Sequence, residues 1–332
     1  MRLIIIGVTL LCLSCGQPEH SYIKIAGPTM GTAYNISYFD SKGVNYKSQI
    51  DSFLIEINNS LSTYIETSTI SRVNQADSIC QVDEMFIEVF NEAKEIQVKS
   101  NGAFEPTIMP LVNAWGFGYK DKLTMDSTIV DSILSLVNFD NVDLIESKVV
   151  KKHKNISIDF SAIAKGYGVD LVAKFMEIKG VINYMVEIGG EVRCNGLNSK
   201  AKIWKLGIDE PVFEAEFRRN INATLELDNE SMATSGNYRN YYEKDGKKYV
   251  HTINPKTGYP EQNDLLSATI ISDDCMTADA YATACMVLGF SKAKKLIETE
   301  HSLEAYFIFF DENNEMKNYW TKGLTGKIDL VE

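Results

Sequence analysis

Asp279 and Thr283 stand four residues apart in the segment 277–288, whose many small side chains predict a helix. Residues four apart lie on one face of a helix, so the carboxylate and the hydroxyl would point the same way. Mg²⁺ binds such oxygen ligands and fills its remaining positions with water and substrate phosphates. The same spacing also suits a hydrogen-bonded Asp–Thr pair inside a core, and the two residues alone leave both interpretations open.

A possible phosphate-binding segment follows at residues 159–167, which leave a predicted strand and open a predicted helix with Ser161 placed to cap it. The free amides and the dipole at a helix N-terminus attract phosphate, and Lys165 adds a positive charge. The alternative is an ordinary capped helix that carries a solvated lysine.

Two loops also combine residues that could contact a ligand. Residues 102–107 place the ring of Phe104 and the carboxylate of Glu105 just after a predicted helix. His251 ends a predicted strand before a Pro-to-Gly turn at 255–258, and the ordinary histidine pKa of about 6.5 suits a general base. A simple turn and a structural histidine are the alternatives.

Hydrophobic periodicity predicts the elements that must position these residues. Apolar residues with helical spacing predict helices at 50–61, 86–96, 130–137, 277–288 and 292–300. Alternating or β-branched runs predict strands at 156–160, 185–188, 265–272 and 304–310. Because helices and strands do not follow a regular βαβ period, we expect an α+β fold with mixed or antiparallel sheets packed against helices.

Composition excludes several classes of protein. The 332 residues are 45% hydrophobic and carry a formal net charge of −12, which is typical of a globular body and not of a disordered, collagen-like or coiled-coil chain. Proteins that bind duplex nucleic acid need a basic surface, so we expect no nucleic-acid partner. The GxGxxG and GxxxxGK[ST] patterns of dinucleotide and P-loop sites do not occur.

The N-terminus has the features of an export signal. One arginine precedes an apolar run at 3–13, which is too short to span a bilayer, and Cys15 follows a small residue. This arrangement resembles the lipobox of bacterial lipoproteins, although Cys12 occupies a position that usually holds Leu. We predict a signal peptide at 1–14, a lipidated Cys15 that opens an anchor and tether at 15–24, and a membrane-anchored protein of the bacterial envelope that faces the periplasm. An ordinary secretory signal is the alternative.

Eight short motifs occur along the chain in the order in which one family has them: Thr29-Met30-Gly31-Thr32, Ser62-Thr63-Tyr64, Gly102 to Thr107, Asp159 to Asp170, Glu187-Ile188-Gly189-Gly190, Ala233-Thr234-Ser235-Gly236, His251 to Gly258 and Ala278-Asp279-Ala280. On these motifs the chain resembles the ApbE-type FAD:protein FMN transferases, formerly called thiamine biosynthesis lipoproteins. The resemblance covers about residues 25–310 and implies an ApbE-like single catalytic domain at 25–332.

The resemblance implies a Mg²⁺-dependent enzyme that moves FMN from FAD onto a threonine of an exported flavoprotein or redox-complex subunit and releases AMP. Position by position, the flavin-side motifs correspond to Met30, Tyr64, Ala103, Phe104 and Glu105. Further FAD contacts correspond to Ser161, Lys165, Tyr167, Thr252 and Ile253, and the metal ligands to Asp279, Thr283 and the backbone carbonyl of Ala164. At Glu105 the family commonly has Asp, so the carboxylate here reaches one methylene farther.

An acidic protein cannot hold a pyrophosphate by its net charge, so Mg²⁺, Lys165 and a helix N-terminus would have to compensate that charge locally. The metal ligand Asp279 is then catalytic, and His251 is the expected base for the threonine hydroxyl. Two other functions stay open: a Mg²⁺-dependent FAD pyrophosphatase that yields FMN and AMP, and a flavin-binding lipoprotein without turnover.

Overall fold

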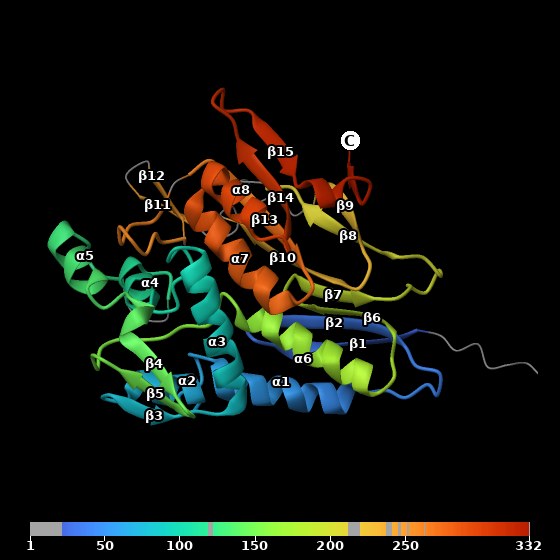
Figure 1. Cartoon of the computed structure of the whole chain (residues 1–332), viewed down its shortest axis with the longest axis horizontal. Helices are drawn as coiled ribbons and strands as arrows, with labels where there is room; N and C mark the ends of the chain where they lie inside the picture. Colours follow the sequence, from blue (N-terminus) through green and yellow to red (C-terminus); the bar gives the residue numbers. More distant parts are fainter. Residues whose placement is uncertain are drawn as a thin grey trace, which may run out of the picture.

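An eight-stranded antiparallel sheet forms the centre of the protein (Figure 1). The computed structural model describes residues 22–118, 122–211, 220–236, 252–261 and 263–331, and the backbone of 241–244 and 247–250. In spatial order the strands of the sheet are β1 (Ile23–Thr29), β2 (Thr32–Phe39), β6 (Asn183–Ile188), β7 (Glu191–Asn195), β10 (Glu230–Gly236), β13 (Leu265–Ser272), β14 (Glu304–Phe310) and β15 (Met316–Trp320).

Two smaller sheets and a hairpin complete the described strands. One sheet holds β16 (Ile328–Leu330), β9 (Ile221–Leu227) and β8 (Trp204–Asp209), and the other β3 (Ile79–Gln81), β5 (Lys148–Lys151) and β4 (Val142–Ile145). The hairpin pairs β11 (Tyr241–Lys244) with β12 (Lys247–Val250). All of these pairs are antiparallel, so the predicted α+β class with antiparallel sheets is confirmed.

Helices form where the periodicity predicts them, with shifted ends. Their bounds are α1 (Lys47–Leu61), α2 (Thr69–Gln75), α3 (Glu84–Lys99), α4 (Met109–Trp115), α5 (Ser127–Leu134), α6 (Ala164–Ile178), α7 (Cys275–Leu288) and α8 (Phe290–Thr299), and two short 3₁₀ turns lie at Phe139–Asn141 and Lys322–Leu324. Asp83 caps α3, because its carboxylate accepts a hydrogen bond from the amide of Phe86. Within the described residues, none of the helices is long and apolar enough to cross a bilayer.

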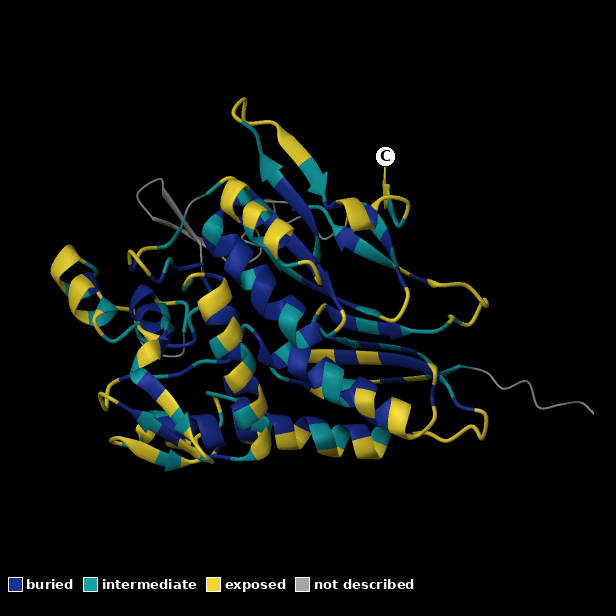
Figure 2. Cartoon of the chain, viewed as in Figure 1, coloured by how far each residue is buried: buried dark blue, intermediate teal, exposed yellow. Residues whose placement is uncertain are grey.

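The central sheet is covered on both faces. Helices α6 and α7 pack against one face, with α3 in front of them (Figure 1), and the β8–β9–β16 sheet supplies Trp204 and Leu225 to a second core on the other side. Strand β13 is buried at every position (Figure 2). A strand with both faces covered is mostly apolar on both, which explains why β13 carries apolar and small polar residues and no charged one.

Hairpin β6–β7 turns through Gly189 and Gly190. Their φ angles are 64° and 110°, a conformation that side chains other than glycine rarely adopt. Because the turn needs only two residues, the chain passes directly from the buried end of β6 into Glu191, the first residue of β7.

The strand predicted at 156–160 is absent from the structure. The alternation of buried and half-buried residues is real, but the segment lies outside every sheet. The amide of Ile158 donates to the side chain of Asn74 over 2.7 Å, and the amide of Asp159 donates to the carbonyl of Pro106 over 2.8 Å. Ser161 is likewise not the helix cap, because α6 begins three residues later and the Ser161 hydroxyl donates to Asp159 Oδ1.

Three cysteines, Cys194, Cys275 and Cys285, are buried and free of disulfides. They lie among apolar neighbours in the two cores beside the central sheet. Burial in these surroundings raises the pKa of all three thiols.

Candidate active site

A cavity of about 860 Å³ lies between the helices and the central sheet. Its wall joins segments that are far apart in the sequence, from the loop after α1 to the last turn of α7. Among the residues predicted for the site, the cavity wall includes Tyr64, Ala103, Phe104, Glu105, Ser161, Lys165, Thr252, Ile253, Asp279 and Thr283.

Helix α7 brings Asp279 and Thr283 to this wall. The helix starts at Cys275 because Asp274 caps it, accepting a hydrogen bond from the amide of Thr277 over 2.8 Å. Small residues at alternate positions let α7 pack closely against α6 and the sheet, so Asp279 is buried yet borders the cavity. The helical spacing therefore directs both oxygen-bearing side chains into one space.

The two side chains do not pair with each other in the described structure. The Asp279 Oδ2 atom accepts a hydrogen bond from the amide of Gly166 over 3.1 Å, and the Thr283 hydroxyl hydrogen-bonds to Ser235 over 3.3 Å. No hydrogen bond within the described residues reaches the other carboxylate oxygen of Asp279. The structure therefore does not contain the hydrogen-bonded Asp279–Thr283 pair that was the alternative interpretation.

Lys165 lies between two buried carboxylates. Its Nζ atom is 3.5 Å from Asp279 Oδ2 and 3.3 Å from Glu191 Oε1, and its side chain is 26% exposed. Burial alone would lower the pKa of Lys165, but the charges of Asp279 and Glu191 raise it above its usual value. Lys165 therefore stays protonated and places a positive charge at the cavity wall.

Glu191 is a site residue that the sequence interpretation missed. Its side chain is 5% exposed, and its Oε2 atom is buried without a hydrogen-bond partner. Burial raises the pKa of Glu191 to about 8, although Lys165 opposes the shift. The available signal was its position directly after Gly189-Gly190, where a tight turn ends and a buried strand begins.

The wall has the donor chemistry of a hard-cation site. Its described carboxylates are Glu105, Asp159, Glu191, Asp209 and Asp279, whereas Lys165 is the one lysine or arginine among its described residues. The described chain has no group of three or more His, Cys, Asp and Glu side chains arranged around a metal, so a cation here would depend on neutral oxygens and on the ligand. A pyrophosphate entering so acidic a cavity would need such a cation, and the Asp279 and Thr283 oxygens fit Mg²⁺.

Aromatic and apolar side chains form another part of the wall. Tyr64 is 76% exposed at the cavity, whereas Phe104 is buried in the wall. Glu105 turns its carboxylate toward the protein: Oε1 accepts a hydrogen bond from the amide of Thr107 over 2.9 Å, and Oε2 one from the amide of Phe139. Burial raises the pKa of Glu105 against these hydrogen bonds, and the longer side chain of Glu serves this bridge.

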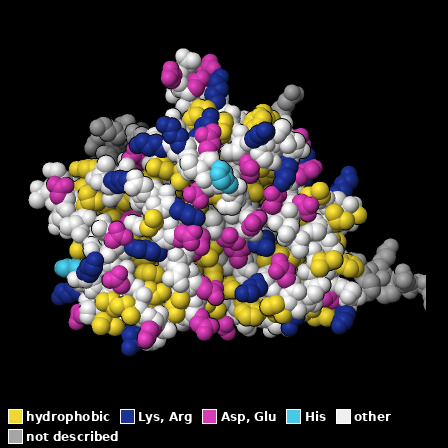
Figure 3. Space-filling model, in the orientation of Figure 1, with side chains coloured by type: hydrophobic (Ala, Val, Ile, Leu, Met, Phe, Trp, Pro, Cys, Tyr) yellow, Lys and Arg dark blue, Asp and Glu magenta, His cyan; other side chains and the backbone are white. Residues whose placement is uncertain are grey.

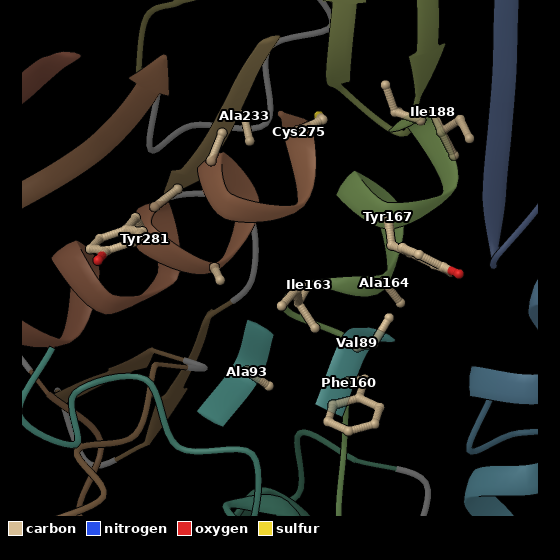
Figure 4. Close-up of a cluster of buried hydrophobic side chains, with 14 of the residues drawn as sticks. Val89, Ala93, Phe160, Ile163, Ala164, Tyr167, Ile188, Ala233, Cys275 and Tyr281 are labelled. Atoms are coloured by element: carbon tan, nitrogen blue, oxygen red, sulfur yellow. The ribbon is translucent and has the colours of Figure 1, made fainter. Parts of the chain in front are cut away.

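Three predicted residues lie elsewhere in the described structure. Met30 sits in the β1–β2 turn with a φ of 49°, Ala164 is buried as the first residue of α6, and neither is among the described residues of the cavity wall. Tyr167 lies in the core between α6 and α3 (Figure 4), and its hydroxyl donates to Glu88 over 2.8 Å. His251 and Cys15 fall outside the described residues, although Thr252, next to His251, lines the cavity.

Comparison with known proteins places this geometry in context. A model of the ApbE family matches residues 30–307. Curated FAD:protein FMN transferases of Vibrio cholerae and Haemophilus influenzae are each 36% identical to the chain, covering 89% and 91% of it and 90% and 91% of their own length. The solved flavin transferase ApbE from Vibrio cholerae covers 92% of this chain and 99% of its own at 32% identity, with a TM-score of 0.84. The apo flavinyl transferase ApbE of Pseudomonas stutzeri gives 0.82 at 30% identity, with 92% and 96% covered.

Proposed function

The chain belongs to the ApbE family and transfers FMN from FAD to protein, and we propose that it does so with Mg²⁺, onto a threonine of an exported redox protein, with release of AMP. One observation carries the finer proposal: Asp279, Thr283 and Lys165 border the same cavity as Tyr64 and Phe104. A single space thus offers a surface for a flavin ring and charged groups for a pyrophosphate.

The cavity suits FAD in size and in the nature of its wall. Its volume of about 860 Å³ lies near the upper end of the range for sites that take small molecules and cofactors. An aromatic side chain such as Tyr64 can stack on a flavin, and Ala103 and Phe104, next to Glu105, add small and apolar surface to the same wall. Ser161, Thr252 and Ile253 also line the cavity and can supply further contacts.

We propose that Asp279, Thr283 and the carbonyl of Ala164 hold Mg²⁺. When bound, the metal supplies the positive charge that the pyrophosphate needs in this acidic cavity. Lys165 adds a second positive charge, held in place by Glu191 and Asp279. The amide of Gly166 fixes the orientation of the Asp279 carboxylate through its hydrogen bond to Oδ2.

The reaction breaks the phosphoanhydride bond of FAD and forms a phosphoester bond to threonine. The hydroxyl oxygen of the acceptor threonine bonds to the phosphorus of the FMN half, the bond from that phosphorus to the AMP oxygen breaks, and the hydroxyl proton passes to a base. His251 is the proposed base because its neighbours Thr252 and Ile253 line the cavity. Lys165 would balance the negative charge that grows on the departing AMP.

Mass spectrometry of an acceptor peptide tests this function. The peptide, with one threonine, is incubated with the protein, FAD and Mg²⁺, and a second peptide with valine at that position serves as the control. We expect an added FMN on the threonine peptide alone and one AMP for each FMN attached. Free FMN with no modified peptide, even for acceptor segments taken from exported redox proteins, would indicate the pyrophosphatase instead.

We further propose that the protein is exported and anchored by a lipid on Cys15 after removal of residues 1–14, and that it faces the periplasm. The short apolar run and the small residue before Cys15 support the anchor. This location would place the cavity in the same compartment as an exported acceptor protein.

A further inference from the structure

Exposed apolar side chains gather at the end of the molecule that lies opposite the Gly189-Gly190 turn. Ile178 and Ile182, at the end of α6 and just after it, are 75% and 68% exposed, and Leu197, in the connection from β7 to β8, is 43% exposed. Val44 and Ile203 are also exposed on neighbouring loops. We call the segments 40–46, 174–183 and 196–203 the lysine-rich end, for the charges described below.

The strand register shows that these segments meet in space. Phe39, the last residue of β2, pairs with Asn183, the first residue of β6, and Tyr184 pairs with Asn195, the last residue of β7. The loops that follow β2, precede β6 and follow β7 therefore all leave the sheet at the same end of these strands. The amide of Leu197 donates to the Asn183 side chain over 2.7 Å, and all three loops point to the right in Figure 1.

Aromatic contacts join the loop after β2 to the end of α6. The ring of Tyr46 packs edge-on against Phe175 with 5.6 Å between centroids, and the ammonium group of Lys179 lies 5.3 Å from the centroid of the same ring. Tyr38 fixes the loop from within, because its hydroxyl donates to the carbonyl of Val44 over 2.9 Å. These contacts hold the loop after β2 against the end of α6, so the exposed apolar residues on both belong to one end of the molecule.

This end is basic in a protein that is otherwise strongly acidic. Its three segments contain five lysines, all exposed, namely Lys42, Lys174, Lys179, Lys200 and Lys202. The two acidic residues there are Asp40, which is buried and hydrogen-bonded within its own loop, and Glu177. The whole chain has a formal charge of −12, whereas these segments hold five lysines and two acidic residues. At the right-hand end of Figure 3, Lys or Arg side chains lie beside hydrophobic ones.

The described chain begins at the same end. The hydroxyl of Tyr22 donates to the carbonyl of Leu197, and its ring packs against Trp204 with 6.2 Å between centroids. Cys15 precedes Tyr22 by seven residues. Even a fully extended chain of that length reaches only about 25 Å, so a lipid on Cys15 would hold this end close to a bilayer.

We propose that the lysine-rich end lies on the surface of a membrane that contains anionic phospholipids. Ile178, Ile182 and Leu197 enter the boundary between head groups and acyl chains, and the lysines contact the lipid phosphates. The orientation follows from the β6–β7 hairpin, whose Gly189-Gly190 turn borders the cavity at its far end. Six residues of β6 span about 20 Å, so the cavity is held off the membrane where a soluble acceptor can reach it. The proposal rests on the proposed lipid anchor but not on the transferase chemistry.

Fluorescence quenching by brominated lipids tests the contact. The full-length lipidated protein is reconstituted in vesicles of phosphatidylglycerol and phosphatidylcholine with brominated acyl chains, as the variants Ile182→Trp and Ile79→Trp. Ile79 is a matched control because it is 60% exposed and lies on β3, in the separate β3–β5–β4 sheet. Relative to the unsubstituted protein, we expect strong quenching of the added tryptophan at 182 and none at 79.

Charge reversal tests the role of the lysines. In the unlipidated Cys15→Ala background, Lys200→Glu with Lys202→Glu should weaken partitioning to the anionic vesicles by about tenfold or more, with little change on neutral vesicles. Equal quenching at both tryptophans, no quenching at either, or concentration-dependent dimerisation through this end in place of lipid contact would overturn the proposal. All of these residues lie outside the cavity wall, so FMN transfer measured in detergent should stay normal, and its loss would count against the proposed function instead.

Discussion

The amide of Gly166 hydrogen-bonds to the carboxylate of Asp279 over 3.1 Å and thereby ties the first turn of α6 to the middle of α7. The two helices can approach this closely because Gly166 has no side chain: a Cβ there would collide with the carbonyl oxygen of Cys275. The glycine therefore serves both the packing of the helices and the orientation of the proposed metal ligand.

We predict that Gly166→Ala is destabilising although alanine favours helices. Backbone atoms of α7 block the new methyl group, so unfolding should become easier by about 2–4 kcal/mol, and FMN transfer should fall with it. Gly168→Ala in the same helix is the matched control, because its Cβ would meet flexible side-chain ends at 3.3 Å and 3.4 Å. Chemical denaturation of both variants measures the difference, and equal stabilities would refute the argument from close packing.

For the metal site, we predict that Asp279→Asn lowers FMN transfer by about 100-fold or more, since the removed charge is the one that holds Mg²⁺. The amide oxygen can still accept the hydrogen bond from Gly166, so the fold should persist, although the lost ion pair with Lys165 should lower the melting temperature. Thr283→Val should have a smaller effect, because a neutral hydroxyl contributes less than a carboxylate to binding a hard cation.

Rates and melting temperatures of both variants are compared with and without Mg²⁺, and EDTA should abolish transfer by the unsubstituted protein. Full activity in EDTA, or a normal rate for Asp279→Asn, would rule out the metal assignment.

At the flavin part of the cavity, Tyr64→Ala should weaken FAD binding by about 1–3 kcal/mol if the ring stacks on the flavin as aromatic side chains stack on nucleic-acid bases. Since Tyr64 is 76% exposed, the free energy of unfolding should change by no more than about 0.5 kcal/mol. Tyr64→Phe keeps the ring and should keep the affinity. Calorimetric titration with FAD measures the affinity of each variant, and an unchanged affinity in Tyr64→Ala would exclude stacking.

Glu191 should make the stability of the protein depend on pH. Its pKa is about 8 in the folded state against 4.5 for an ordinary glutamate, so between these values the folded state keeps a proton that the unfolded state has lost. Raising the pH through this window must then lower the free energy of unfolding. Glu191→Gln should flatten this dependence, whereas Glu312→Gln, on the exposed β14–β15 loop, should leave it as it is. Denaturation at several pH values measures both slopes, and identical slopes in all three proteins would contradict the assignment.

For the anchor, Cys15→Ala should move the protein from the membrane to the soluble fraction or leave it unprocessed. Cys12→Ala should not change its distribution, because only Cys15 follows the small residue expected before a lipidated cysteine. Cell fractionation with mass spectrometry of the N-terminal peptide provides the measurement. An unmodified Cys15 in mature, membrane-bound protein would disprove lipidation.

Much of the fold could be predicted because burial leaves periodic traces in the sequence. Helix α3 has one buried face, so Phe86, Val89, Phe90 and Ala93 recur at helical spacing. Strand β13 is mostly apolar and holds no charged residue, because both of its faces are covered. For the site, the i, i+4 spacing of Asp279 and Thr283 correctly placed both in one space.

Other features depend on partners that local patterns do not reveal. The alternation at 156–160 mimics a strand, but Asn74 and Pro106 take the backbone hydrogen bonds that a neighbouring strand would take. Tyr167 belongs to the motif at 159–170, but its ring packs into the core and its hydroxyl donates a hydrogen bond to Glu88 on α3. Glu191 belongs to the site through its tertiary contact with Lys165. Its place after two glycines indicates a tight turn but does not reveal this partner.

Because Cys194, Cys275 and Cys285 are buried, the rate at which their thiols are labelled can report unfolding of the protein. A thiolate is the form of cysteine that attacks an alkylating reagent. While the cores stay closed, these three thiols are buried and their pKa values are raised, so they react slowly. Their labelling should therefore proceed at a rate set by transient opening of the molecule. Cys194 lies in the core beneath the β8–β9–β16 sheet, and Cys275 and Cys285 lie in the core beneath the helices. The labelling rates of these thiols would therefore give the opening rate of each core separately.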